Sequence, residues 1–417
     1  MKKTLLAITL STFFLTACGG DSDSSSNSSS PSTLTKKGQL IDGAIEGADY
    51  YINGEKAGTT DVDGTFSYNE GDEITFKIGD IEIGTVQGAE RITPLELATS
   101  ADAQTNLMVF LQSLDADGNH DNGITLPKLE DLASLSTLNI DFEQPTTNFY
   151  QNLNANLSKI DKFKDLRVVT PLQAIENFNK TMFELMPENT KASLKNIAGI
   201  WYFQGTEDDE SPIALIIKED GSYIMGEVVL NEEEKEFNGL EVGKINTYNP
   251  STGLFTASAF IDTNKDWGLT DFGKPRNMIL KLEAGQLTIQ EEKNPEESAT
   301  FSQVPNTASG IVGAWKAEAG PIFIFNTDNT YLMLDPVGDD LAISESERCG
   351  DAGIEYGTYT LSGNTLRINS IIIDTNGCAG LSDNGATGEG LPISLTPNSL
   401  SFTVADEGTF TLSRINY

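Results

Sequence analysis

The sequence contains few of the residues on which most enzyme mechanisms depend. Its 417 residues include one histidine, His120, and three cysteines. A single histidine excludes most Ser-His-Asp, Cys-His and histidine-rich metal sites. The sequence also lacks G-x-S-x-G, H-E-x-x-H and the glycine motifs that bind nucleotide phosphates. We therefore expect a protein that is not an enzyme, with His120 in a solvated loop.

Positive charge is scarce as well. The chain has 27 Lys and Arg against 62 Asp and Glu, which gives a formal net charge of −35. Neutralising nucleic-acid phosphates requires clusters of Lys and Arg, and the sequence shows none. The same deficit argues against docking on an anionic lipid surface. We expect no nucleic-acid partner.

Long hydrophobic runs are confined to the N-terminus. Met1-Lys2-Lys3 precedes an apolar run from Thr4 to Leu15, which has the length of a signal peptide. No later stretch reaches the ~18 apolar residues that a membrane-spanning helix needs. The run ends in Leu15-Thr16-Ala17-Cys18, which resembles the lipobox of bacterial lipoproteins. That resemblance implies removal of residues 1–17 and a diacylglycerol group on Cys18.

The residues after Cys18 indicate a tether and a location. Residues 18–37 are rich in serine and have little to bury, so we expect a flexible, disordered linker. In lipoproteins, aspartate directly after the lipidated cysteine favours retention in the inner membrane, and here that residue is Gly19. The resemblance therefore implies a lipid anchor in the outer membrane. We expect the folded part at the cell surface rather than on the periplasmic face.

The other two cysteines are Cys349 and Cys378. In the oxidising compartment that the lipobox implies, a remaining pair usually forms a disulfide. The alternative is two buried free thiols.

The first half of the mature chain divides into two segments that differ in the spacing of their apolar residues. Residues 38–92 alternate short β-rich runs with Asn-Gly and Asp-Gly turns, which predicts a small β-sandwich. The run from Gly58 to Phe66 resembles the T-D-x-x-G-x-F turn of transthyretin-like, carboxypeptidase-regulatory-like domains, in which these residues are structural. Residues 93–195 change to helical spacing, and the capping sequences Thr93-Pro94-Leu95-Glu96 and Thr170-Pro171-Leu172-Gln173 begin two of the predicted helices.

The second half contains an internal repeat. Five collinear matches at offsets of 108 to 114 residues relate residues 196–307 to residues 308–417. Both copies begin with G-x-W, containing Trp201 and Trp315, which resembles the first motif of lipocalins and other calycins. That resemblance implies small β-barrels, in which an Arg from the last strand packs over the Trp. Arg414 suits this role in the second copy, and the first copy has no Arg near Gln303. A β-sandwich is the alternative, and the fold class is mainly β with several domains.

One loop has the spacing of a cation site. Asp115, Asp117, Asn119 and Asp121 place oxygen ligands at alternate positions after a predicted helix, and Ca²⁺ takes six to eight oxygens. The loop lacks the Gly and Glu of an EF-hand. A metal-free turn rich in Asp and Asn explains the same pattern. No other cofactor is indicated.

Three functions remain open. A tethered, modular chain without a catalytic motif is typical of a lipid-anchored binding or adhesion protein for an extracellular macromolecule, with two linked copies gaining avidity. A carrier of a small, lipid-like molecule is the second, because small barrels can hold an apolar ligand. The third is an accessory factor that binds an envelope protein during pilus or secretion assembly.

Overall fold

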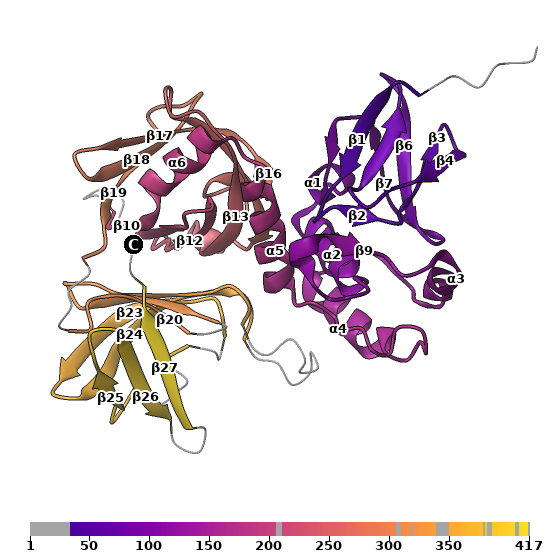
Figure 1. Ribbon diagram of the computed structural model, residues 1–417. Coiled ribbons are helices and arrows are strands. Elements are labelled where there is room, and N and C mark those ends of the chain that lie inside the picture. The colour runs from indigo at the N-terminus through magenta and orange to yellow at the C-terminus, as the bar shows by residue number, and fades with distance from the viewer. Residues whose placement is uncertain are drawn as a thin grey trace, which may run out of the picture.

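The computed structural model describes residues 34–205, 211–305, 310–317, 320–338, 350–377, 380–381, 386–404 and 408–415. The chain is mainly β and contains two closed eight-stranded barrels. Figure 1 shows the N-terminal half on the right, the first barrel at the upper left and the second barrel below it. The predicted multi-domain β fold is confirmed, and the β-sandwich alternative for the repeats is wrong.

Two small sheets form the N-terminal part. One has the order β5-β1-β8 and the other has the order β4-β3-β6-β7. Their strands are β1 (Lys36–Leu40), β3 (Asp49–Ile52), β4 (Glu55–Thr59), β5 (Thr65–Tyr68), β6 (Glu73–Ile78), β7 (Ile81–Gln87) and β8 (Arg91–Ile92). A further short strand, β2 (Ile45–Glu46), pairs in parallel with β9 (Ile124–Thr125), and this pairing ties the sheets to the helical segment.

The turn between β4 and β5 is structural, as its resemblance implied. The Asp61 carboxylate accepts the N–H groups of Asp63 at 3.1 Å and Thr65 at 2.8 Å. Gly64 has a φ of 69°, and a Cβ there would lie 2.5 Å from the carbonyl oxygen of Leu40. Only glycine fits this position without displacing the backbone.

The helical segment follows these sheets. Its elements are α1 (Pro94–Leu97), α2 (Ala101–Ser113), η1 (His120–Asn122), α3 (Leu129–Leu132), η2 (Ala133–Thr137), α4 (Thr146–Leu157), α5 (Pro171–Glu184) and α6 (Glu188–Ile197). Thr93 and Glu96 form the predicted capping box of α1, and the Thr170 hydroxyl caps α5. The helices and the two sheets share one hydrophobic core, which includes Phe66, Phe110 and Phe178.

The first barrel closes in the order β10-β11-β12-β13-β14-β17-β18-β19. Its strands are β10 (Gly199–Phe203), β11 (Ile213–Ile217), β12 (Ser222–Glu227), β13 (Gly239–Tyr248), β14 (Leu254–Asp262), β17 (Asn277–Glu283), β18 (Gln286–Glu291) and β19 (Ser298–Gln303). The short elements η3 (Lys235–Phe237), β15 (Thr270–Asp271) and β16 (Lys274–Pro275) lie outside this order. Apolar side chains such as Leu215, Phe255 and Phe301 fill the interior.

The second barrel has the same strand order. Its strands are β20 (Gly313–Lys316), β21 (Ile322–Phe325), β22 (Thr330–Asp335), β23 (Gly353–Ser362), β24 (Thr365–Asp374), β25 (Leu391–Leu395), β26 (Ser399–Val404) and β27 (Gly408–Arg414). Phe323, Met333 and Leu400 are among the side chains that fill it. Both interiors are therefore packed cores, as is usual for small eight-stranded barrels.

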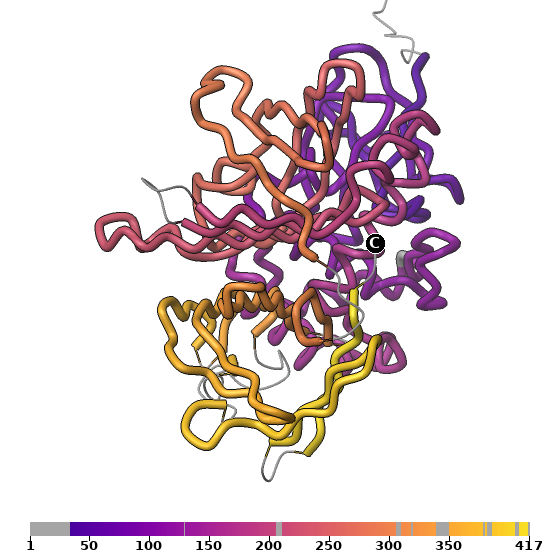
Figure 2. Tube along the Cα trace, turned by 90° about the vertical axis from the view of Figure 1, so that its left-hand side faces the viewer, coloured from indigo at the N-terminus to yellow at the C-terminus, as the bar shows by residue number. Residues whose placement is uncertain are grey.

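The two barrels pack against each other through equivalent strands. β12 and β13 of the first barrel contact β22 and β23 of the second, and the outward-facing residues of both merge into one apolar cluster. Figure 2 shows the second barrel, orange to yellow, directly below the first. At the contact, a Cβ on Gly226 would lie 2.1 Å from a methyl group of Leu334, so glycine makes room for the other barrel. The repeat thus folds as a pseudo-symmetric pair.

Candidate functional site

The three cysteines, Cys18, Cys349 and Cys378, lie outside the described residues. The residues next to the second and third are described, and Gly350 and Gly377 form an antiparallel β-bridge. The predicted lipidation and disulfide stay predictions.

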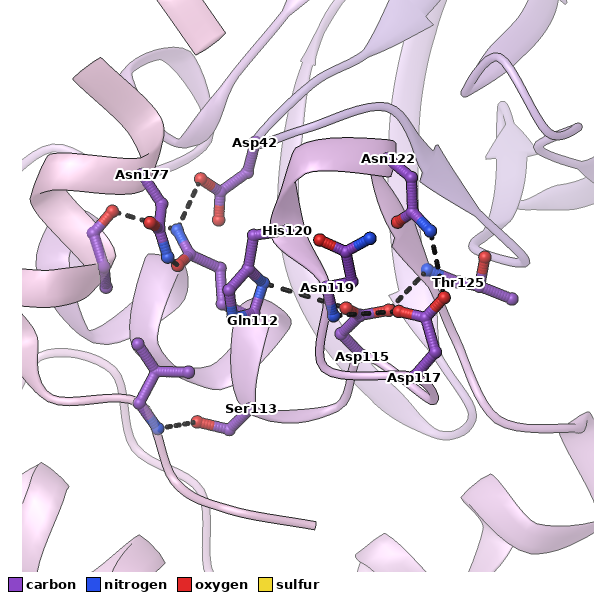
Figure 3. Close-up of polar contacts among 12 residues, drawn as sticks. Asp42, Gln112, Ser113, Asp115, Asp117, Asn119, His120, Asn122, Thr125 and Asn177 are labelled. Carbon is purple, nitrogen blue, oxygen red and sulfur yellow. Dashed lines mark hydrogen bonds and ion pairs between the residues drawn. The ribbon is translucent and has the colours of Figure 1, made fainter. Parts of the chain in front are cut away.

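The aspartate-rich loop after α2 is held by its own hydrogen bonds (Figure 3). Asp117 accepts the N–H of Asn119 at 2.8 Å and the amide of Asn122 at 2.9 Å. Asp115 accepts the N–H of Thr125 at 3.0 Å. Asp121 is exposed and pairs with Lys180 of α5 at 2.6 Å. The contacts therefore favour the turn interpretation over a Ca²⁺ site.

His120 is more enclosed than a solvated loop position predicts. Its side chain is 16% exposed, and its Nδ1 lies 3.8 Å from a carboxylate oxygen of Asp115. Burial raises the pKa of Asp115. Sequence reasoning missed this pairing because the loop turns back on the end of α2, and residue spacing alone does not show that.

Beside this loop, a second buried acid faces α2 (Figure 3). The Gln112 amide donates to Asp42 at 3.0 Å and to the carbonyl of Ala174 at 2.9 Å. Its oxygen accepts the amide of Asn177 at 2.9 Å. Burial raises the pKa of Asp42 well above its usual range. This network joins the first sheet to α2 and α5, so we assign it a structural role.

The predicted role of the two G-x-W tryptophans is structural, and both are buried in the barrel interiors. Each indole N–H donates to the carbonyl four residues earlier, Ile197 for Trp201 and Ile311 for Trp315. Trp267, in a loop of the first barrel, stacks on Phe237 at 5.1 Å. Trp201 and Trp315 are therefore core residues, and Trp267 is half-buried with one ring face against Phe237.

Each barrel encloses a buried glutamate that sequence reasoning did not single out. Glu241 accepts the Tyr223 hydroxyl at 3.3 Å and the N–H of Leu269 at 2.9 Å. In the second barrel, Glu355 accepts the Tyr331 hydroxyl at 2.7 Å. The sequence repeat could have indicated these glutamates, because its matching segments G-L-E-V-G and G-I-E-Y-G contain Glu241 and Glu355. Protein donors surround both carboxylates, which indicates a structural network.

A groove lies on the helical segment. It has a volume of about 550 Å³ and runs between α4 and the chain that precedes it. Four amide side chains line it, and we call it the amide groove: Asn139, Gln144, Asn152 and Asn156. Leu138, Ile140 and Ile160 supply apolar surface, and the charges of Asp141 and Lys159 balance. The groove thus combines neutral hydrogen-bonding groups with apolar patches.

The sequence of α4 explains why the amides face outward. Phe149 and Leu153 are one turn apart and buried in the core, and Asn152 and Asn156 lie on the neighbouring stripe of the helix, at the edge of the buried face, so both stripes line the groove. Lys159 donates to Asn156 at 3.1 Å, and Asn152 donates to Gln144 at 3.3 Å. The spacing of Asn152 and Asn156 could have indicated this groove from the sequence. The apolar spacing of α4 predicts only its buried face.

Comparisons with known proteins add little. No family model matches the chain, and no curated protein matches it. Among solved structures, BamB from Moraxella catarrhalis aligns with 49% of this chain and 70% of its own, at 11% identity and a TM-score of 0.11. A TM-score this low carries no argument about fold or function.

Two findings bear on membrane and metal binding. Among the described residues, no helix is both long and apolar enough to cross a bilayer. In the same part of the chain, no three His, Cys, Asp or Glu side chains are grouped to hold a metal ion.

Proposed function

We propose that this chain is a non-catalytic lipoprotein of the outer membrane that binds a neutral glycan at the cell surface through the amide groove. The groove itself is the observation that carries the proposal. Small polar groups above apolar surface are typical of binding sites that fix a ligand by a few hydrogen bonds.

The chemistry of the groove favours a neutral polyhydroxylated ligand. An asparagine or glutamine side chain both donates and accepts hydrogen bonds, so it can pair with either role of a hydroxyl group. The groove carries no net charge, and the chain as a whole carries −35. That charge repels acidic polymers. A neutral sugar chain is therefore the best match.

The position of the groove agrees with a tether at the opposite end. The described chain starts next to β1, and β1 and α4 lie at opposite ends of the N-terminal half in Figure 1. An anchor on Cys18 attaches the chain to the membrane from its β1 end, and the flexible linker leaves the α4 end free to reach external ligands.

The two other functions find less support. Both barrel interiors are filled by buried side chains, and this argues against a lipid-like molecule carried inside them. The barrels also bury their equivalent faces against each other, so avidity from two independent copies is not the basis of this proposal. No contact of the described residues specifically favours a role in pilus or secretion assembly.

The full chain, produced without its acyl group as Cys18→Ser, is tested on an array of neutral and acidic glycans. We expect binding to neutral glycans, and about tenfold weaker binding for Asn152→Ala and Asn156→Ala. Asn154→Ala is the matched control, because Asn154 is exposed on α4 but does not line the groove. Equal binding by all three variants, or binding to acidic glycans alone, would contradict the proposal.

A further inference from the structure

A second cavity lies where the N-terminal half meets the first barrel. Its volume is about 330 Å³, and its walls come from β8, α1, α2 and α5 on one side and from β13 and β14 on the other. Lys244 of β13 lines it and is 1% exposed. The cavity is separate from the amide groove and from both barrel interiors.

The ammonium group of Lys244 is buried without a carboxylate partner among the described residues. It donates to the carbonyl oxygens of Asn179 at 2.8 Å and Asp220 at 3.4 Å. An ammonium has three N–H donors, so one has no partner in the described structure. Burial lowers the pKa of Lys244 to about 8, which leaves it mainly charged at neutral pH. The Asp220 carboxylate offsets part of the cost of burying this charge, and an anionic ligand at the ammonium group would offset more of it.

The other walls add a second cation and an apolar surface. Arg91 lines the cavity and forms no ion pair with the described residues. The one acidic residue of the lining is Glu96, whose carboxylate already accepts the N–H and hydroxyl of Thr93. Half-buried Met182 and Met186 form the apolar side, and methionine adapts readily to ligand shape. In a strongly acidic chain, the lining of this cavity thus combines two cationic side chains with apolar ones.

We propose that this cavity binds a small aliphatic monocarboxylate, with the carboxylate at Lys244 and the hydrocarbon chain along Met182 and Met186. The shape of the site fits an amphipathic acid better than an inorganic anion, which would leave the apolar side empty. Such a ligand contacts the helices and the first barrel at once. It therefore stabilises the junction between them by mass action.

Octanoate and octanol are titrated into the full chain, with calorimetry as the readout. We expect octanoate to bind at least about tenfold more tightly than octanol, because the charged hydrogen bond to Lys244 is lost with the alcohol. Lys244→Met keeps most of the unbranched side chain and removes its charge, and we expect a loss of at least about tenfold in octanoate affinity. Lys281→Met is the matched control, since Lys281 is exposed on β17 away from the cavity.

A second measurement does not depend on a folded variant. In ¹³C-methyl NMR of the wild-type methionines, octanoate should shift the signals of Met182 and Met186 and leave buried Met333 unchanged. No octanoate binding, equal affinity for octanol, unchanged binding by a folded Lys244→Met, or unmoved Met182 and Met186 signals would each overturn the proposal. Because the amide groove is elsewhere, these outcomes leave the glycan proposal untouched.

Discussion

The guanidinium carbon of Arg414 lies 3.9 Å from the centre of the Trp315 ring. In the register of the barrel, Trp315 is opposite Arg414 on the last strand, and Trp201 is opposite Gln303 in the first copy. Arg414 also donates to the carbonyl oxygens of Pro397, Val312 and Gly310. The calycin-like Trp–Arg contact is therefore present in one copy and replaced in the other.

We predict that Arg414→Gln, which gives the second barrel the pair found in the first, destabilises the protein by roughly 1–3 kcal/mol. The variant loses a cation–π contact and leaves main-chain acceptors without their charged donor. Thermal and urea unfolding measure the change. Arg367→Gln is the control, because Arg367 is exposed in the same barrel, and it should cost less than about 0.5 kcal/mol. Equal effects of the two variants would show that the contact with Trp315 adds no stability.

The barrels were predictable because their signals are local. G-x-W, alternating strands and matched turns recur at a nearly constant offset, so the second half could be divided into two equivalent β domains from sequence alone. The capping residues Thr93 and Thr170 likewise marked the starts of α1 and α5. Each of these features depends on neighbours within a few residues in the chain.

The features that could not be predicted depend on which faces of the helices, sheets and barrels pack against each other. The N-terminal sheets and the helices share one hydrophobic core, which their different sequence patterns do not indicate. The contact between Gly226 and Leu334 joins residues of different barrels. Lys244 looks like an exposed barrel residue in the sequence, and it is buried only because α5 covers it. Hydrophobic spacing identifies a buried face but not its partner.

The buried acids of the first barrel predict an unusual pH dependence. Burial raises the pKa of Glu227 to about 8 and that of Glu241 to about 7. Between the ordinary glutamate pKa of 4.5 and these values, the folded chain holds protons that the unfolded chain has released. The free energy of unfolding therefore falls as pH rises from about 4.5 to 8 and levels off above that.

We expect a higher melting temperature at pH 5 than at pH 8, and a smaller difference for Glu227→Gln, which mimics the protonated acid. Glu296→Gln makes the same charge change at an exposed position and should retain the wild-type difference. If both variants retain it, the titrating groups lie elsewhere and the assignment to Glu227 is wrong.

The aspartate-rich loop should behave as a turn. Because Asp117 is occupied by Asn119 and Asn122, we expect Asp117→Ala to lower the melting temperature without any metal present. Millimolar Ca²⁺ should leave the melting temperature of the wild-type chain unchanged. Exposed Asp121, which pairs with Lys180, provides a comparison through Asp121→Ala, which should lower the melting temperature less. A Ca²⁺-dependent rise that Asp117→Ala abolishes would restore the metal-site interpretation.

The bridge between Gly350 and Gly377 supports the predicted disulfide. Gly350 directly follows Cys349 in the sequence, and Gly377 directly precedes Cys378, so the described chain brings the neighbours of the two cysteines side by side. Peptide mapping of the secreted protein without reduction should therefore recover the two cysteines in one linked pair of peptides. Complete alkylation of both thiols without a reductant would instead identify two free cysteines.

The central claim is that the amide groove faces the outside of the cell. Asn154→Cys introduces a thiol at an exposed position of α4, the helix that forms one wall of the groove, and wild-type cells serve as the background for the native cysteines. A membrane-impermeant maleimide is applied to intact cells and to cells with a permeabilised outer membrane. The account predicts equal labelling of Asn154→Cys in both samples, above the wild-type background. Labelling only after permeabilisation would place the groove in the periplasm and contradict the proposed function.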